Sequence, residues 1–436
     1  MKSIKKLLFT AMFIGLIVAL AACGSESGDD SSSESTSGDG ASDTEEQVTI
    51  TYARSNDVTP STEKLIEKFE ETHPNITIEL REMPSSTSES HDQYVTIFSS
   101  QSSEIDVFDA DVVWTAEFAQ ADYVMELDRF IEESEVNMDE YFPGPVDAVT
   151  YNNRIWAMPK FSDAGLLYYR TDLVENAPET WDDMIAMAEE AAGKEGTEFG
   201  FAMQANQYEG LVVNALEYIS AYGGQILDEN GEVVIDSPES VKGLEKMVEI
   251  AQSDITPNNV LNFSETETET AFLEGKTVFA RNWPYMSNTA EDEERSKVAG
   301  NVGYAVLPAG DDGSASTLGG WTAMISRYSE HPAEAWEFLQ FMTGEEGQII
   351  SAVEGARAPT LEALYDLDEV KEAAPLFAME EFVASLQNAV SRPVSPIYPE
   401  LSDIMQIELS KALAGEITAE EAVQNMQAKM TAATNE

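Results

Sequence analysis

The hydrophobic and polar positions of residues 47–80 predict a strand, a helix and a second strand. The stretch QVTITYARS alternates apolar and polar residues with the period of two that a half-buried strand has. The next stretch, PSTEKLIEKFEETHPNITIEL, has apolar residues spaced as on one helix face, breaks at Pro74-Asn75 and then alternates again. A strand, a helix and a strand in this order indicate a βαβ unit.

Two later segments have similar patterns. In SSEIDVFDADVVWTAEFAQADYVMELDRFI, residues 105–108 are typical of a buried strand, and helical spacing follows. PETWDDMIAMAEEAA predicts a helix with an N-capping pair, Thr180 and Asp183, and with an apolar face made of Met184, Ile185 and Ala188. Strands that alternate with helices predict an α/β architecture.

The N-terminus has the pattern of an export signal. Residues 1–22 combine a lysine-rich start with an apolar run that is too short and wrongly flanked for a membrane span. The run ends in Leu20-Ala21-Ala22-Cys23, which resembles the bacterial lipobox, where the cysteine is acylated and becomes the mature N-terminus. A buried free thiol after an ordinary signal peptide is the alternative. We expect a lipid anchor at Cys23 on the extracellular face of the cell membrane.

The segment after the lipobox has a different composition. Residues 24–46 are rich in Ser, Gly, Asp and Glu and lack aromatic side chains, so residues 23–46 are expected to form an acylated cysteine and a disordered linker. Cys23 is the only cysteine of the chain, which excludes disulfides within the body. About 390 residues remain, enough for two domains.

The charge of the chain excludes one class of partner. Asp and Glu number 81 against 24 Lys and Arg, a formal net charge of −57 that disfavours binding to nucleic acid. The acidic residues are spread over amphipathic helices rather than gathered in one tail. We interpret them as a surface that stays soluble in a saline or alkaline habitat, and not as a cation-binding surface.

Enzymatic chemistry has weak support in the sequence. The three histidines, His73, His91 and His331, stand far apart, and none lies in a metal-binding motif. The stretch EGKT at 274–277 lacks the first glycine of a phosphate loop, because position 270 is Thr. We therefore expect no metal and no cofactor. A secreted carbohydrate-active enzyme with a carboxylate pair stays open as an alternative.

The order of motifs resembles a known family, the extracellular solute-binding proteins of ABC sugar importers (family 1), and within it the trehalose/maltose-binding proteins. The motifs are LIEKFEETHPNITIEL, DVFDADVVWTAEFAQADYVMELD, FSDAGLLYYRTDL, PETWDDM, AFLEGKTVFARNWPY, STLGGWTAMISRYSEHPAEAWEFLQFMTGEEGQ and RPVSPIYPELSDIMQ. This resemblance implies a type II periplasmic-binding-protein-like fold of two α/β lobes, with the ligand in the interlobe cleft. It implies a first lobe of residues 47–160 and 303–348 and a second of 161–302 and 349–436.

Aromatic residues are the first candidates for a sugar site, because flat rings cover the apolar face of a pyranose. Trp283 lies in the loop-like ARNWPY, and Trp321 follows Gly319-Gly320, where the missing side chains allow close approach to a ligand. Core packing is the alternative for each ring. The resemblance implies that both rings stack on the sugar and that Gly320 contributes to the site. Three other aromatics lie in helical patterns and are assigned to packing: Trp181, Trp336 and Phe338.

Polar candidates complete the set. Asp109 and Asp111 follow a predicted strand at the end where open α/β sheets place ligand groups. The resemblance favours Asp111, whereas Asp109 has a turn cap as its alternative, and it implies that Asp163 accepts hydrogen bonds from sugar hydroxyls. Phe161 stands where relatives have Tyr. Arg392 and Tyr398, in SRPVSPIYPELSD, resemble a late cleft segment of the family that supplies a guanidinium group and a ring, and surface positions are the alternative for both. Four positions have weaker support: Asn56 and Asp57 after the first strand, and Ser90 and His91.

The resemblance implies a lipid-anchored, monomeric binding protein without enzymatic activity. Its ligand would be an α-linked disaccharide such as trehalose or maltose, or a short oligosaccharide, and its partner a membrane permease. The same fold with a different solute remains the other alternative.

Overall fold

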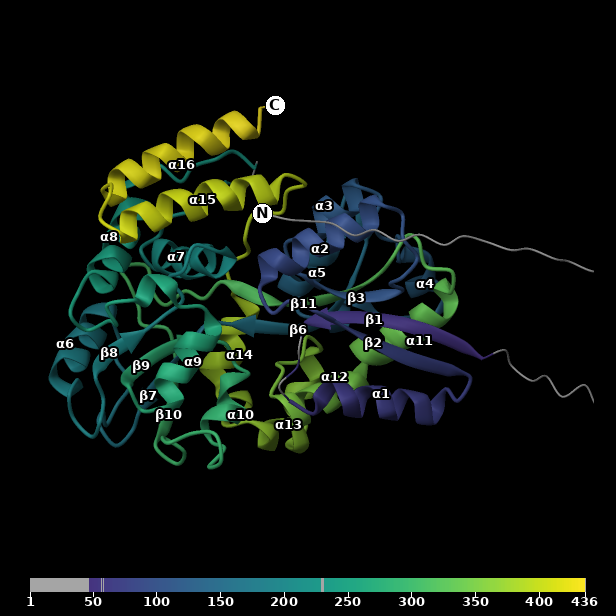
Figure 1. Ribbon diagram of the computed structural model, residues 1–436, viewed down its shortest axis with the longest axis horizontal. Helices are drawn as coiled ribbons and strands as arrows, with labels where there is room; N and C mark the ends of the chain where they lie inside the picture. Colours follow the sequence, from purple (N-terminus) through teal and green to yellow (C-terminus); the bar gives the residue numbers. More distant parts are fainter. Residues whose placement is uncertain (1–46, 56, 58, 229–230, 436) are drawn as a thin grey trace, which may run out of the picture. The chain divides into compact units, whose positions relative to one another are not determined.

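The computed structural model describes residues 47–55, 57, 59–228 and 231–435, in which the strands form two larger sheets and one small hairpin. The predicted signal peptide, Cys23 and linker lie outside the described residues, as does Asn56. In Figure 1, β1, β2, β3, β6 and β11 gather on one side of the body and β7, β8, β9 and β10 on the other. This arrangement confirms the α/β class and the two lobes.

The first sheet has the strand order β2-β1-β3-β11-β6. Strands β2 and β3 are parallel to β1, and α1 connects β1 to β2, which confirms the βαβ unit. Strand β11 comes from much later in the chain and runs antiparallel between β3 and β6. The bounds are β1 Val48–Ser55, β2 Ile76–Met83, β3 Val107–Asp111, β6 Met158–Ala164 and β11 Leu318–Ile325.

The second sheet has the strand order β10-β7-β9-β8. Strand β7 is antiparallel to both of its neighbours, and β8 is parallel to β9. Its bounds are β7 Leu166–Arg170, β8 Phe199–Ala202, β9 Thr277–Asn282 and β10 Val302–Val306, and the hairpin consists of β4 Thr150–Tyr151 and β5 Arg154–Ile155.

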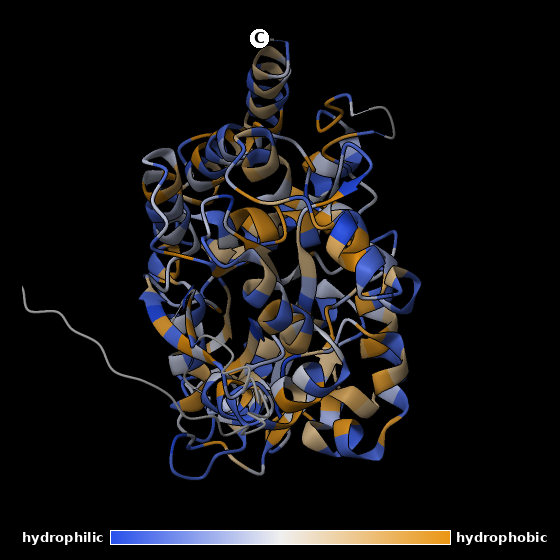
Figure 2. Ribbon diagram, turned by 90° about the vertical axis from the view of Figure 1, so that its right-hand side faces the viewer, coloured by the Kyte–Doolittle hydropathy of each residue, from blue (hydrophilic) through white to orange (hydrophobic). Residues whose placement is uncertain are grey.

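Helices cover both sheets, and hydrophobic and hydrophilic residues alternate along the same helices, as in amphipathic helices (Figure 2). The α-helices are α1 Ser61–Thr72, α2 Thr87–Ser99, α3 Thr115–Gln120, α4 Asp128–Glu133, α5 Pro143–Val149, α6 Trp181–Ala191, α7 Glu209–Ala221, α8 Pro238–Ala251, α9 Glu265–Leu273, α10 Met286–Ala290, α11 Pro332–Thr343, α12 Glu345–Gly355, α13 Asp368–Ala373, α14 Glu380–Gln387, α15 Tyr398–Leu413 and α16 Ala419–Ala433. Short 3-10 helices are η1 Met138–Glu140, η2 Val260–Asn262, η3 Glu362–Asp366 and η4 Pro375–Ala378.

The first sheet is buried on both faces by aromatic side chains. On one face the ring of Tyr52 in β1 lies 5.2 Å from that of Phe338 in α11. On the other, Phe108 of β3 lies 4.8 Å from Phe98 of α2 and 4.9 Å from Tyr94. Edge-to-face and tilted rings at these distances add to the stability that area burial provides. A sheet held from both sides keeps the ends of its strands in place.

The second lobe shows the predicted helix cap. The Thr180 hydroxyl accepts a hydrogen bond from the Asp183 backbone N–H, and the Asp183 carboxylate accepts one from the Thr180 N–H, both at 3.1 Å. Trp181 then packs on Tyr218 with ring centroids 4.2 Å apart. Trp336 packs on Phe130 at 5.4 Å. The packing assignments of both tryptophans agree with these contacts.

The chain passes between the two sheets later than the sequence predicted at each of three points. Gly165 separates β6 from β7, so the expected boundary at 160/161 falls inside β6. Strand β10 pairs with β7, which moves the second crossing from 302/303 to residues 307–317. Helix α12 packs on α1 and α11, and the third crossing follows α14, in residues 388–397. The positions of these crossings depend on which distant strands pair with one another, and local sequence patterns carry no information about that pairing.

We expect Thr180→Ala to lower the free energy of unfolding by about 1 kcal/mol, because the first turn of α6 loses an N-cap. Urea unfolding followed by circular dichroism measures the change. Thr96→Ala is the matched control: Thr96 is exposed within α2 and its hydroxyl only donates to the Asp92 carbonyl. The control should stay within about 0.5 kcal/mol of the wild type. An equal loss in both variants would contradict the capping role.

Candidate functional site

Strand β11 brings five predicted residues into register. Trp321 lies opposite Asp111 of β3 on one side and opposite Phe161 of β6 on the other. One pair further along, Gly320 lies opposite Ser162, and then Gly319 opposite Asp163. Trp321 is half-buried, whereas Asp111, Phe161 and Asp163 are buried. Residues that are separated by up to 210 positions in sequence therefore lie next to one another on three neighbouring strands of the first sheet.

Gly320 meets two requirements that only glycine satisfies. Its φ is +103°, in the region that residues with a side chain rarely adopt. A Cβ at this position would lie 2.8 Å from the Ser162 Cα atom, and the register of the pairing with β6 shifts between Trp321 and Thr322. Such an irregularity redirects side chains. Gly320 thus determines how the Trp321 ring leaves the strand.

Asp163 has a buried carboxyl with an unused acceptor. The residue is 6% exposed, and its Oδ1 atom has no hydrogen-bond partner. Burial raises the pKa of Asp163 to about 7, although the positive charges of Arg357 and Arg281 oppose the shift. A buried acceptor without a donor is costly, and a ligand hydroxyl would satisfy it.

Trp283 comes from the second sheet, directly after β9, and is half-buried. Its ring reaches the first sheet, because a Cβ on Gly319 would lie 2.6 Å from the ring and 3.2 Å from the Asp163 Cβ atom. The guanidinium carbon of Arg281 lies 4.0 Å from the ring centroid. The Trp283 ring is therefore placed beside Asp163, between the two sheets.

Arg392 joins the two lobes through a pair of charge-assisted hydrogen bonds. Its Nη2 donates to Asp111 of β3 and its Nη1 to Glu209 at the start of α7, both at 2.7 Å. These two carboxylates outweigh the effect of burial and raise the pKa of Arg392. The Tyr398 hydroxyl also donates to Glu209, at 2.5 Å, while the buried Nε of Arg392 has no partner. One guanidinium N–H is thus left without an acceptor from the protein.

Asp109 takes part in a different network. Its carboxylate accepts from the Lys160 ammonium at 2.7 and 2.9 Å and from the Tyr52 hydroxyl at 2.6 Å. All three residues are buried. Asp109 therefore links β1, β3 and β6. The turn after β3 is instead capped by Asp111, whose Oδ1 accepts from the Val113 N–H at 3.2 Å.

Asp57 lies before α1 and is surrounded by positive charge. Its carboxylate lies 3.2 Å from Arg54 and 3.5 Å from Arg357, and it accepts from the hydroxyl of Thr62. Burial alone would raise the pKa of Asp57, but the two guanidinium groups and the hydroxyls outweigh it and lower the pKa. The Arg357 guanidinium lies 5.0 Å from the centroid of the Phe161 ring. Asp57 is thus connected to the site indirectly, because Arg357 contacts both Asp57 and the Phe161 ring.

His91 and Tyr398 meet at a cavity of about 220 Å³ between α2 and α15. The Nε2 atom of His91 lies 2.7 Å from Glu117, and the imidazole ring packs edge-on against Trp114. Burial lowers the pKa of His91, but the hydrogen bond and charge of Glu117 outweigh it and raise the pKa. Ser90, in contrast, is fully buried, and its hydroxyl donates to the Pro84 carbonyl at 2.6 Å. Glu209, which binds Arg392, also lines this cavity.

Four residues of the site were not predicted from the sequence: Glu209, Arg281, Tyr285 and Arg357. Glu209 and Arg281 stand in stretches that read as helix and strand, where a buried charge has no local signature. The sequence offered one signal for these residues, the scarcity of basic side chains. The chain has 24 Lys and Arg, and any arginine among them that is buried must be paired with an acidic residue. Tyr285 lies 5.5 Å from the Arg357 guanidinium and extends the aromatic surface.

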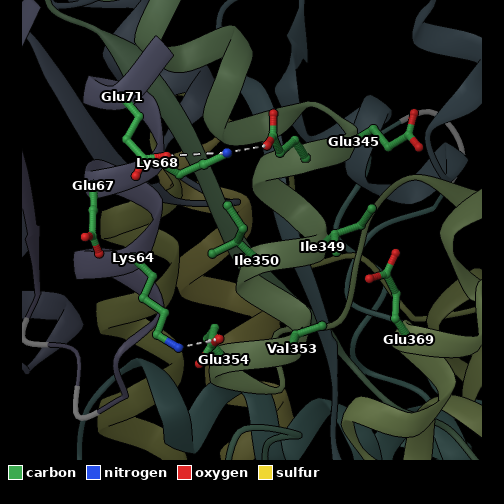
Figure 3. Close-up of a pocket in the computed structure, with 11 residues that line it drawn as sticks. Lys64, Glu67, Lys68, Glu71, Glu345, Ile349, Ile350, Val353, Glu354 and Glu369 are labelled. Atoms are coloured by element: carbon green, nitrogen blue, oxygen red, sulfur yellow. Dashed lines mark hydrogen bonds and ion pairs between the residues drawn. The ribbon is translucent and has the colours of Figure 1, made fainter. Parts of the chain in front are cut away.

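A groove of about 640 Å³ lies elsewhere, between α1 and α12 (Figure 3). Its floor is formed by Ile349, Ile350 and Val353, and ion pairs such as Lys64–Glu354 at 2.6 Å cross its rim. The residues that line it include none of the predicted site residues. The groove is therefore separate from the candidate site.

The chemistry of the site suits a neutral ligand with hydroxyl groups and an apolar face. Two half-buried tryptophans offer ring surface, while Asp163 and Arg392 offer a buried acceptor and a buried donor. Among the described residues, no group of His, Cys, Asp and Glu could hold a metal ion. In that same part of the chain, no helix has the length and apolarity needed to cross a membrane.

Comparisons with known proteins agree with this geometry. Residues 53–349 match the model of the family described as bacterial extracellular solute-binding protein. A Deinococcus radiodurans protein described as a probable ABC transporter-binding protein is 36% identical over 341 residues, which cover 75% of this chain and 79% of that protein. A putative binding protein of Brucella abortus is 25% identical over 79% of this chain and 82% of its own length.

Solved structures show the same fold. Maltose-bound MalE3 of T. maritima has 39% sequence identity and a TM-score of 0.82, covering 88% of this chain and 99% of its own. The GacH receptor of Streptomyces glaucescens has 23% identity and a TM-score of 0.78, covering 88% and 97%. The second likeness concerns the fold alone. With the family match over residues 53–349, these findings show that the chain belongs to the bacterial extracellular solute-binding proteins, the binding components of ABC importers, and not to a family of enzymes.

Proposed function

We propose that this protein binds an α-linked disaccharide, such as maltose or trehalose, and delivers it to the permease of an ABC importer. The observation that carries the proposal is the pairing of two half-buried tryptophan rings, Trp283 and Trp321, with the unpartnered polar atoms of Asp163 and Arg392. Rings stack on the apolar face of a pyranose, and carboxylate and guanidinium groups bind its hydroxyls.

A similar protein supports the choice of sugar. MalE3, at 39% identity over nearly its whole length, was solved with maltose. Other solved structures of this fold hold different solutes, including tagatose and ribitol, but their identities of 22% and 20% support the fold alone. A disaccharide is therefore the favoured ligand, and another solute in the same fold is the second candidate.

The site is built to respond to ligand by closing. Asp111 and Trp321 belong to the first sheet, whereas Trp283 follows a strand of the second and Glu209 begins a helix of the second lobe. A ligand that contacts both lobes binds the closed form better than the open form and shifts the population toward it. The ion pair of Arg392 with Asp111 has the same effect, because it joins the two lobes.

The anchor belongs to the same proposal. Acylation of Cys23 would hold a monomeric protein at the outer face of the membrane, and the polar linker would leave the two lobes free to close near the permease. The family works outside the cytoplasm, which agrees with an export signal in residues 1–22.

Trp283→Ala and Trp321→Ala should each weaken disaccharide binding by about 1 to 3 kcal/mol, because each removes one stacking surface. Isothermal titration calorimetry with maltose and with trehalose measures the loss. Trp336→Phe is the matched control, since Trp336 packs on Phe130 away from the site. The control should bind sugar like the wild type. Unchanged binding in both alanine variants, or cleavage of labelled sugar by the wild type, would refute the proposal.

Asp163 should make stability depend on pH. An unfolded Asp loses its proton near its usual pKa of 3.8, whereas native Asp163 keeps it up to about 7. The native state thus binds more protons between these pH values, and the free energy of unfolding falls as the pH rises through this window. We expect the sugar-free wild type to lose on the order of 4 kcal/mol more than Asp163→Asn across this range, because each unit of pKa shift corresponds to about 1.4 kcal/mol.

Urea unfolding at intervals of pH measures the difference between wild type and Asp163→Asn. Parallel profiles for the two proteins would show that the Asp163 carboxyl is ionised in the native state and would contradict the raised pKa. The comparison removes the effect of the other acidic residues, since both proteins carry them.

Cys23→Ser should release the protein from the membrane, because the sulfur is the attachment point for lipid in a lipobox. Fractionation of cells after a salt wash, with immunodetection of the protein, measures the release. Mass spectrometry of the wild-type N-terminus provides the control. A Cys23→Ser protein that stays in the membrane fraction would contradict lipid anchoring.

A further inference from the structure

A buried ion pair lies behind the candidate sugar site. Glu217 of α7 and Arg281 of β9 are 2% and 1% exposed. Arg281 Nε donates to Glu217 Oε2 at 2.9 Å and its Nη2 to Oε1, while Nη1 donates to Gln204 at 3.1 Å. Each of the three guanidinium nitrogens thus has a protein acceptor. Three of the five guanidinium N–H groups of Arg281 are therefore bound to Glu217 and Gln204.

The pair is packed against the first crossing between the lobes. A Cβ on Gly165 would lie 2.6 Å from Arg281 Nη2 and closer still to Glu217 Oε1. Gly165 is the residue that separates β6 from β7. Its backbone carbonyl also accepts from the Ser316 hydroxyl at 2.9 Å, next to the second crossing. The guanidinium is consequently held in one place by its partners and by the hinge backbone.

The Trp283 ring is fixed by three different contacts. The Arg281 guanidinium carbon lies 4.0 Å from its centroid, which covers one ring face. Gly319 packs against the six-membered part of the Trp283 ring, since a Cβ atom on Gly319 would lie 2.6 Å from Cζ3. The indole Nε1 donates to Glu265 at 3.4 Å. Arg281 thus occupies one face of a ring that stays half-buried.

We propose that Arg281, held by Glu217, is a positioning residue that fixes the Trp283 ring for stacking on the ligand. This inference rests on the proposed sugar-binding function. Arg281 acts through the ring and does not contact the sugar, so its effect on affinity requires Trp283.

The energetics of the pair support a role in binding. Burying two charges costs desolvation that their attraction rarely exceeds, so the pair adds little to stability over an apolar pair of the same volume. A ring that is already in its bound orientation loses less conformational freedom when the ligand arrives. A planar guanidinium stacks on an indole, whereas a lysine ammonium keeps the charge and loses the flat contact. Arg281→Lys therefore separates the contact from the charge.

The test is a double-mutant cycle with Arg281→Lys and Trp283→Ala, measured by calorimetry with maltose and trehalose. Arg281→Lys alone should lower the affinity about tenfold, within the range of a desolvated cation–π contact. In the Trp283→Ala background the same change should alter affinity less than twofold. An equal loss in both backgrounds, or a loss under twofold in the wild type, would overturn the proposal.

Acrylamide quenching of tryptophan fluorescence follows the ring without any sugar. Arg281→Lys should increase quenching, and the increase should vanish in a Trp283→Phe background. An unchanged quenching constant would overturn the proposal. If the wild type binds no disaccharide, the proposed function fails while this measurement still decides whether Arg281 holds the ring.

Arg170→Lys is the matched control. Arg170 is a buried arginine of the same sheet, 6% exposed, and its Nε donates to Asp172 at 2.6 Å. It should leave sugar affinity and quenching unchanged. If Arg281→Lys is recovered unfolded, Arg281→Met combined with Glu217→Met removes both buried charges at similar volume and should fold. The same cycle and quenching measurements then apply to the double variant.

Discussion

The pairing of β11 between β3 and β6 is the constraint on which the site depends. A strand from residues 318–325 runs antiparallel to two strands from the first half of the chain. Side chains alternate between faces with a period of two, so a slip of one residue would send the Trp321 ring to the other face and separate it from Asp111 and Asp163. Gly320, with its positive φ, and the adjacent register shift lock the alignment.

Charge is used differently inside the protein and on its surface. The chain carries a large excess of carboxylates, while three basic residues near the site, Lys160, Arg281 and Arg392, are buried and paired. Lys160 binds Asp109, Arg281 binds Glu217, and Arg392 binds Asp111 and Glu209. A buried charge without a partner would cost several kcal/mol, so these pairs fix where each side chain can lie. In this acidic protein, the positions of the side chains around the site thus depend on a few buried, paired basic residues.

The same pairs connect ligand binding to the hinge. Arg392 lies just before α15, in the third crossing, and Gly165 in the first is packed against the Arg281–Glu217 pair. Asp163 is two residues before Gly165 and lies opposite Gly319. A ligand that binds Asp163 and Arg392 would therefore touch segments that must move when the lobes close. Asp163 and Arg392 therefore both lie in or next to segments that connect the two lobes.

The sequence by itself determined the local elements and the family. The alternation of β1 and the capped α6 predicted the α/β class, because these patterns depend on neighbours in the chain. The two lobes and the candidates Asp111, Asp163, Trp283 and Trp321 came from the resemblance of the ordered motifs to a known family. The sequence did not reveal the crossings at Gly165 and after α14, or the partners of buried charges. Glu209 and Arg281 look like ordinary helix and strand residues until folding brings them to Arg392 and Trp283. Only the tertiary structure decided these, because strand pairing and charge pairing join residues over a hundred positions apart, which no local pattern records.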